Sequence, residues 1–145
     1  MKYRAGTIGK VLLARIDHGE PIVPALTELC AKEGILAGWF FLLGAVTKGS
    51  MVTGPREESL PPVPVWTGFP QPHEIVGMGS VARKDGAPSL HLHASLGRGN
   101  EPLTGCIRKE GEVYLVVEAL ILQVDGMSAS REPDARTGLE LLSVE

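Results

Sequence analysis

The chain has 145 residues, 43% of them hydrophobic and 21% charged, a balance that is typical of a single globular domain and excludes wholesale disorder. Its 14 lysines and arginines are outweighed by 17 aspartates and glutamates, so the net charge of −3 argues against general nucleic-acid binding, which usually needs a basic surface. Two cysteines do not form the framework of a secreted disulfide-rich domain, and the first residues lack the apolar segment of a signal peptide. We therefore expect one cytoplasmic domain over residues 1–145, without a membrane span.

The first third of the chain predicts a strand followed by a helix. Aliphatic residues over 11–17 are typical of a strand. Apolar residues at helical spacing then predict one amphipathic helix from about residue 22 to residue 33. Pro21 stands where a helix start tolerates proline, Cys30 lies on the apolar face as a small buried residue, and Gly34 occupies the position of a C-terminal cap.

Strands follow the helix. Residues 39–43 predict a buried strand with Trp39 in the core, and residues 46–52 extend or follow it. The segment 54–72 contains six prolines and predicts a loop or an edge excursion, in which Trp66 is a candidate for lining a pocket or an interface.

Two strand pairs are predicted in the second half of the chain. Residues 74–82 and 89–97 flank an Asp-Gly dipeptide, a strong signal for a β-hairpin. Residues 103–108 and 112–124 predict a second pair around Glu110-Gly111, and the leucines near residue 141 predict a returning edge strand. The expected fold class is α+β, a mostly antiparallel sheet with one main helix.

Chemistry-bearing residues gather in one of these strands. His91 and His93 are two residues apart on a predicted strand, so both imidazoles project from the same face. From spacing alone, two packed or hydrogen-bonded histidines are the favoured interpretation over two metal ligands.

The order of several short motifs along the chain resembles the plants-and-prokaryotes conserved (PPC) domain family. The resemblance is strongest over residues 11–142. The matching segments are Arg15–Glu20, Gly34–Gly38, Leu43–Val46, His91–Gly97, Gly105–Cys106, Glu110–Val113 and Gly138–Leu142.

The resemblance implies a homotrimer of small α+β subunits. In plant members the domain follows AT-hook segments that contact the minor groove of DNA, and this sequence contains no such hook. Plant members also use a short segment to bind protein partners. The matching residues here are 72–76, which keep Glu74 and Ile75 and differ before them.

The resemblance also extends the histidine pair into a metal site. Many prokaryotic relatives carry a third histidine where this chain has Cys106. Two imidazoles and a thiolate favour Zn²⁺ and leave a fourth coordination position for water or a small ligand. If Gly97 pairs with Pro102, His93 lies opposite Cys106 and all three side chains share a face. If residue 96 pairs with Pro102 instead, Cys106 points away.

Other candidate residues carry weaker signals. His73 and Glu74 approach the histidines if their strands form the predicted hairpin, although a polar strand edge is the favoured explanation. Arg98, between two glycines, is a candidate anion ligand. No motif assigns catalytic residues, so they stay unknown.

Three hypotheses therefore stand. The chain is a homotrimeric module that binds a divalent metal, zinc favoured, and a small ligand, with hydrolytic or lyase-like activity left open. Alternatively, it is a regulatory protein that binds DNA or a transcription partner. The third hypothesis is a purely structural oligomerisation domain in which the histidines serve packing.

Overall fold

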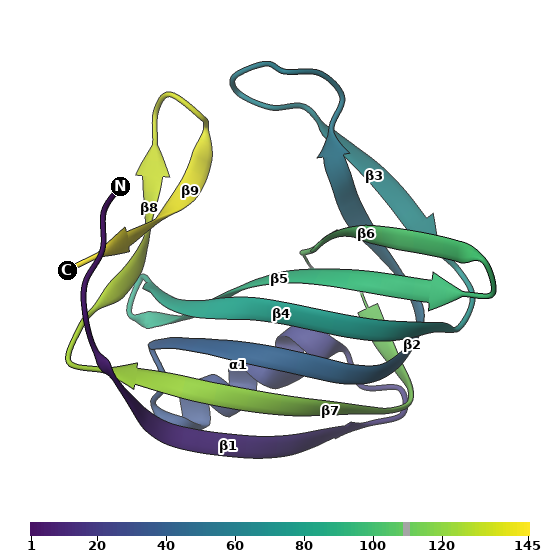
Figure 1. Cartoon of the computed structure of the whole chain (residues 1–145), viewed down its shortest axis with the longest axis horizontal. Coiled ribbons are helices and arrows are strands. Elements are labelled where there is room, and N and C mark those ends of the chain that lie inside the picture. Colours follow the sequence, from purple (N-terminus) through teal and green to yellow (C-terminus); the bar gives the residue numbers. More distant parts are fainter. Residues whose placement is uncertain (109–110) are drawn as a thin grey trace.

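A computed structural model describes residues 1–108 and 111–145 and shows an α+β fold, in which a helix lies against a large, mainly antiparallel sheet (Figure 1). The elements of these residues are β1 (Thr7–Asp17), α1 (Ile22–Glu33), β2 (Ala37–Pro55), β3 (Pro64–Phe69), β4 (His73–Lys84), β5 (Ala87–Arg98), β6 (Glu101–Ile107), β7 (Gly111–Asp125), β8 (Ala129–Asp134) and β9 (Leu139–Val144). The sheet order is β1-β7-β2-β6-β5-β4-β8-β9, and β3 pairs with β2. No helix in the described residues has the length and apolar composition of a membrane span.

Helix α1 has the bounds that the apolar spacing predicted. Its residues Ile22, Leu26 and Cys30 are buried in the main core, where the helix packs against β5 and β7. Gly34 ends the helix with a left-handed φ of 70°, and the Ile35 N–H donates a 2.8 Å hydrogen bond to the Cys30 carbonyl. The helix covers one face of the sheet, so this face forms the core.

Strand β2 connects the two halves of the sheet. Its first part pairs with β4 and β7, and its later part pairs with β3 and, at Val52, with β6. Because β4 also pairs with β5, and β5 with β6, the series of pairings returns to β2. The sheet therefore curls around the core, and β6 is held between β5 and the far part of β2 (Figure 1).

The β2 side chains alternate between two faces, which corrects the prediction of a continuously buried segment. Phe40 and Leu42 are buried, whereas Trp39, Phe41 and Leu43 are 43%, 40% and 60% exposed. Trp39 therefore does not lie in the core of this domain. The helix covers only one face of this antiparallel sheet, so every second side chain of β2 points away from it.

The predicted pairing of residues 103–108 with residues 112–124 is wrong. Strand β6 pairs with β5 and β2, whereas β7 lies between β1 and β2. Glu110 of the proposed turn lies outside the described residues. A local turn signal shows where the chain bends but does not show which strand the chain pairs with afterwards.

The β4–β5 hairpin agrees with the prediction. Asp85 and Gly86 have φ values of 51° and 82°, as a two-residue hairpin turn requires. The proline-rich segment is an edge excursion that contains the short strand β3. The leucine-rich C-terminal segment forms the edge strand β9, which pairs with β8.

Candidate metal centre

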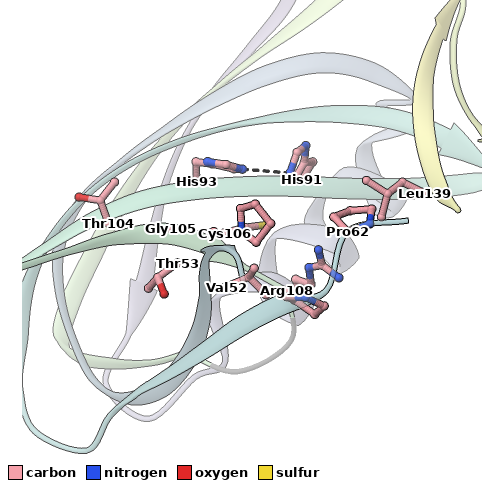
Figure 2. A pocket seen from close by; sticks show the side chains of 13 residues that line it. Val52, Thr53, Pro62, His91, His93, Thr104, Gly105, Cys106, Arg108 and Leu139 are labelled. Atoms are coloured by element: carbon pink, nitrogen blue, oxygen red, sulfur yellow. Dashed lines mark hydrogen bonds between the residues drawn. The ribbon is translucent and has the colours of Figure 1, made fainter. Parts of the chain in front are cut away.

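The two histidines of β5 lie on the face of the strand that points away from the core. His91 and His93 are exposed, whereas the intervening Leu92 is 1% exposed and packs in the core with the helix. The strand alternation that buries Leu92 therefore also presents both imidazoles on the same side. Figure 2 shows the two rings facing each other above β6.

The register between β5 and β6 brings Cys106 to the histidines. Gly97 pairs with Pro102 and His93 with Cys106, which is the first of the two registers that the sequence allowed. Gly105 helps to set this arrangement, because a Cβ at this position would lie 2.4 Å from the Val52 carbonyl oxygen. The absence of a side chain lets β6 approach β2 closely, where Val52 pairs with Cys106.

The donor atoms converge as a metal site requires. The Nε2 atoms of His91 and His93 are 3.2 Å apart and share a hydrogen bond, with the rings inclined at 81°. Two nitrogens bound tetrahedrally to one zinc at its usual bond length lie about 3.3 Å apart. The ligand atoms of both histidines and Cys106 all lie within 4.8 Å of one another.

The surroundings of His91 favour its neutral form. The pKa of His91 lies below its ordinary value, first because partial burial disfavours the charged ring, and then because Arg131, His93 and Arg108 add positive charge nearby. A metal ligand must be the neutral imidazole, so the same surroundings favour the form that binds metal. Burial instead raises the pKa of the Cys30 thiol to about 11, which keeps this second cysteine an unreactive core residue.

A cavity of about 420 Å³ opens beside the donor atoms (Figure 2). Its walls include His91, His93, Cys106, Arg108 and an apolar surface that comes from the β2–β3 hairpin and the start of β9. These two hairpins meet over the site: a Cβ on Gly138 would lie 3.1 Å from the Cβ of Pro61. The site is therefore a partly covered pocket rather than a flat surface.

The other predicted site residues lie elsewhere. His73 Nδ1 is 2.7 Å from the Gln71 carbonyl oxygen, and the His73 ring packs edge-on against Phe69. Glu74 pairs with Gly97 at the far end of β5, and Arg98 pairs with Glu101 at the turn into β6. The structure therefore does not bring these three side chains to the histidines.

Sequence reasoning missed two arginines at the site. Arg108 follows Cys106 by two residues, so strand alternation was a signal that placed it on the same side. Arg131 gave no such signal, because only the parallel contact of β8 with β4, at Ser130 and Arg83, brings it close. The apolar walls from residues 52–64 and Leu139 were also missed, because the curl of the sheet and the hairpin contact create them.

With this geometry in place, comparisons with known proteins define the class. The family model of the Plants and Prokaryotes Conserved (PCC) domain, the family abbreviated PPC above, matches residues 3–125. The chain belongs to this family. No curated protein matches it by sequence.

Solved structures of other proteins share this fold along almost the whole chain. A metal-containing protein from Archaeoglobus fulgidus is 28% identical with a TM-score of 0.87, and the match covers 99% of both chains. A plant- and prokaryote-conserved protein from Pyrococcus horikoshii is 26% identical with a TM-score of 0.87, covering 99% of this chain and 97% of that one. A protein from Bacteroides thetaiotaomicron, named as a candidate DNA-binding protein, is 22% identical with a TM-score of 0.79, covering 95% and 96%, and shows the fold alone.

Proposed function

We propose that this protein is a homotrimeric PPC-domain module that binds a divalent metal, zinc favoured, through His91, His93 and Cys106, and takes a small ligand beside the metal. One observation carries the proposal: three ligand atoms of suitable types lie within 4.8 Å of one another at the wall of a cavity. The similarity to the Archaeoglobus fulgidus protein, whose name states that it contains metal, supports it.

The donor set favours zinc over a hard ion. A thiolate with two imidazoles suits zinc, whereas magnesium and calcium prefer oxygen ligands. Three protein ligands would leave one position open, and a zinc ion with an open position makes bound water acidic or polarises a carbonyl group. The residues Cys106, His91 and His93 would hold the ion, and the adjoining cavity would admit the ligand.

An exposed apolar row supports association between copies of this chain; the number three comes from the family resemblance. Leu13, Leu120, Phe41 and Met78 are consecutive cross-strand neighbours on the outer face of the sheet, and the same row continues to His93. Their exposed fractions run from 37% to 83%, a large apolar surface for a lone subunit to leave in water. Burial between copies would remove this surface from water, and light scattering coupled to gel filtration tests the expected mass of three chains.

The alternative function, DNA or transcription-partner binding, has less support. The neighbours named for DNA binding are 22% and 20% identical, and similarity at this level supports only the fold. The net charge of −3 gives no excess of positive charge for phosphate contacts.

We also propose a cytoplasmic location, because a thiolate ligand needs a compartment that keeps Cys106 reduced.

Cobalt substitution tests the metal site directly. Co²⁺ added to the metal-free protein should give the strong visible bands of a tetrahedral site and a near-ultraviolet thiolate band. Cys106→Ser should lose the thiolate band, and Cys30→Ala should keep it, because Cys30 lies in the core on the other side of the sheet. A wild-type protein that gives neither band, or a thiolate band that depends on Cys30, would overturn the proposal.

A further inference from the structure

Two arginines from separate parts of the chain flank the candidate metal ligands. Arg108 borders the 420 Å³ cavity and also a second cavity of about 460 Å³. Arg131, on β8, lines this second cavity, which His91 and Cys106 also border. His91 and Cys106 therefore border both cavities, and an arginine is present in each.

Neither guanidinium forms a salt bridge with a carboxylate within the described part of the chain. Arg131 donates a 2.7 Å hydrogen bond from Nη2 to the hydroxyl of Ser80, which is 8% exposed and fixes the side chain in place. The Arg108 guanidinium carbon lies 5.8 Å above the centre of the Trp66 ring. These contacts orient both side chains and leave N–H donors available in each.

The charge of the cavity walls is positive although the protein as a whole is acidic. Among the described residues that line the second cavity, Arg108 and Arg131 are cations and Glu140 is a carboxylate. Glu140 interacts with Arg131 and also pairs with Lys84, so this carboxylate is shared among cations and the described lining keeps a net positive charge. The lowered pKa of His91, to which both arginines contribute, agrees with their proximity. A site of this kind attracts an anion.

The apolar walls of the first cavity favour a ligand that has an apolar part. Its walls include Val52, Pro55, Pro62, Pro64 and Leu139, and none of these side chains offers a hydrogen-bond donor or a charge. A fully hydrated inorganic anion would gain nothing from this surface, whereas a ligand with an apolar body would be removed from water there.

We propose that the site binds a small organic carboxylate, whose carboxylate group is held by Arg108 and Arg131 beside the metal and whose apolar body lies in the proline-lined cavity. This inference rests on the proposed function, because it places the carboxylate beside the proposed metal. The arginine contacts do not require the metal, so they can be tested in the metal-free protein as well. Arginine is suited to the role because its planar fork binds both oxygens of a carboxylate at once.

Calorimetric titration with benzoate tests the inference, and benzamide serves as the neutral probe of the same shape. Benzoate should bind both the zinc-loaded and the metal-free protein, more tightly with zinc, and benzamide should bind at least tenfold more weakly. Arg108→Gln and Arg131→Gln should each weaken benzoate binding about 10- to 100-fold, the effect of losing a charged hydrogen bond. Arg4→Gln is the matched control, because Arg4 precedes β1 and its side chain, among the described residues, bonds to the adjacent Tyr3 carbonyl.

The outcomes separate the two proposals. If the folded variants keep their zinc and bind benzoate as the wild type does, or if the wild type does not bind benzoate, the inference fails and the metal site stands. If the wild type takes up no zinc, the proposed function fails, and arginine dependence in the metal-free protein then decides whether carboxylate recognition survives. Inorganic phosphate that binds more tightly than benzoate would overturn the assignment to an organic carboxylate.

Discussion

The two faces of strand β5 carry residues with different roles. On the inner face, Leu92, Ala94 and Leu96 are buried against the helix and the rest of the core. On the outer face, His91 and His93 meet Cys106 at the wall of a cavity. The inner residues hold the strand in place, and the outer residues are available for chemistry because the helix covers only one side of the sheet.

The two cysteines show the same difference. Cys30 is 1% exposed and lies in the core among apolar side chains, where its thiol resists ionisation. Cys106 is also buried, but it faces the cavity beside two imidazoles. Burial alone therefore does not identify a structural cysteine; the polarity of the neighbouring side chains separates the two cases.

Substitutions on the two faces of β5 should separate stability from metal binding, and this is the largest effect that we expect. Leu92→Ala should lower the free energy of unfolding by about 2–5 kcal/mol, because it leaves a cavity in the core, and the variant that stays folded should still take up zinc. His93→Ala should change the stability of the metal-free protein by less than about 0.5 kcal/mol, because its side chain is exposed, and should lose zinc uptake. Urea unfolding and a zinc titration measure both quantities. Equal destabilisation by the two variants would contradict the comparison.

Gly105→Ala should give the next largest effect. The new methyl group would meet the Val52 carbonyl 2.4 Å away, so β6 must shift, at a cost of about 1–3 kcal/mol. Because Cys106 follows directly, the variant should also bind zinc more weakly. Gly97→Ala on β5 is the matched control, since a Cβ there meets nothing within 4 Å. If Gly105→Ala is as stable as Gly97→Ala in urea, Gly105 does not set the approach of β6 to β2.

Thiol labelling compares the two cysteines in the wild-type protein, without any substitution. At pH 8, a pKa of about 11 leaves roughly one Cys30 thiol in a thousand ionised, and the core also excludes reagents. Ellman's reagent should therefore label one thiol of the native metal-free protein, Cys106, and zinc should protect it. Cys30 should react only in urea. Mass spectrometry of the labelled peptides identifies the thiol, and rapid native labelling of Cys30 would contradict this account.

The sequence predicted the parts of the structure that depend on local pattern. Helix α1, its glycine cap and the Asp85-Gly86 hairpin follow from spacing and turn chemistry, and the shared face of His91 and His93 follows from strand alternation. The resemblance to the family supplied the third ligand position, Cys106.

The remaining features depend on how distant segments meet. The sequence left two registers open for β5 and β6, because the choice depends on pairing along the whole β4-β5-β6 series and on the closure of β6 against β2. The wrong prediction that β6 pairs with β7 has the same origin. These two strands follow each other in the sequence, but β2 lies between them in the sheet, and no local pattern reveals this. Arg131 reaches the site through a strand contact that no local motif marks.

The metal content of the purified, untagged protein tests the central claim most directly. Inductively coupled plasma mass spectrometry of the wild type should find about one zinc per subunit, and a His91→Ala/His93→Ala variant that remains folded should contain almost none. A wild-type protein that is metal-free and takes up no added zinc, or a double variant that keeps its full zinc content, would contradict the assignment of the site.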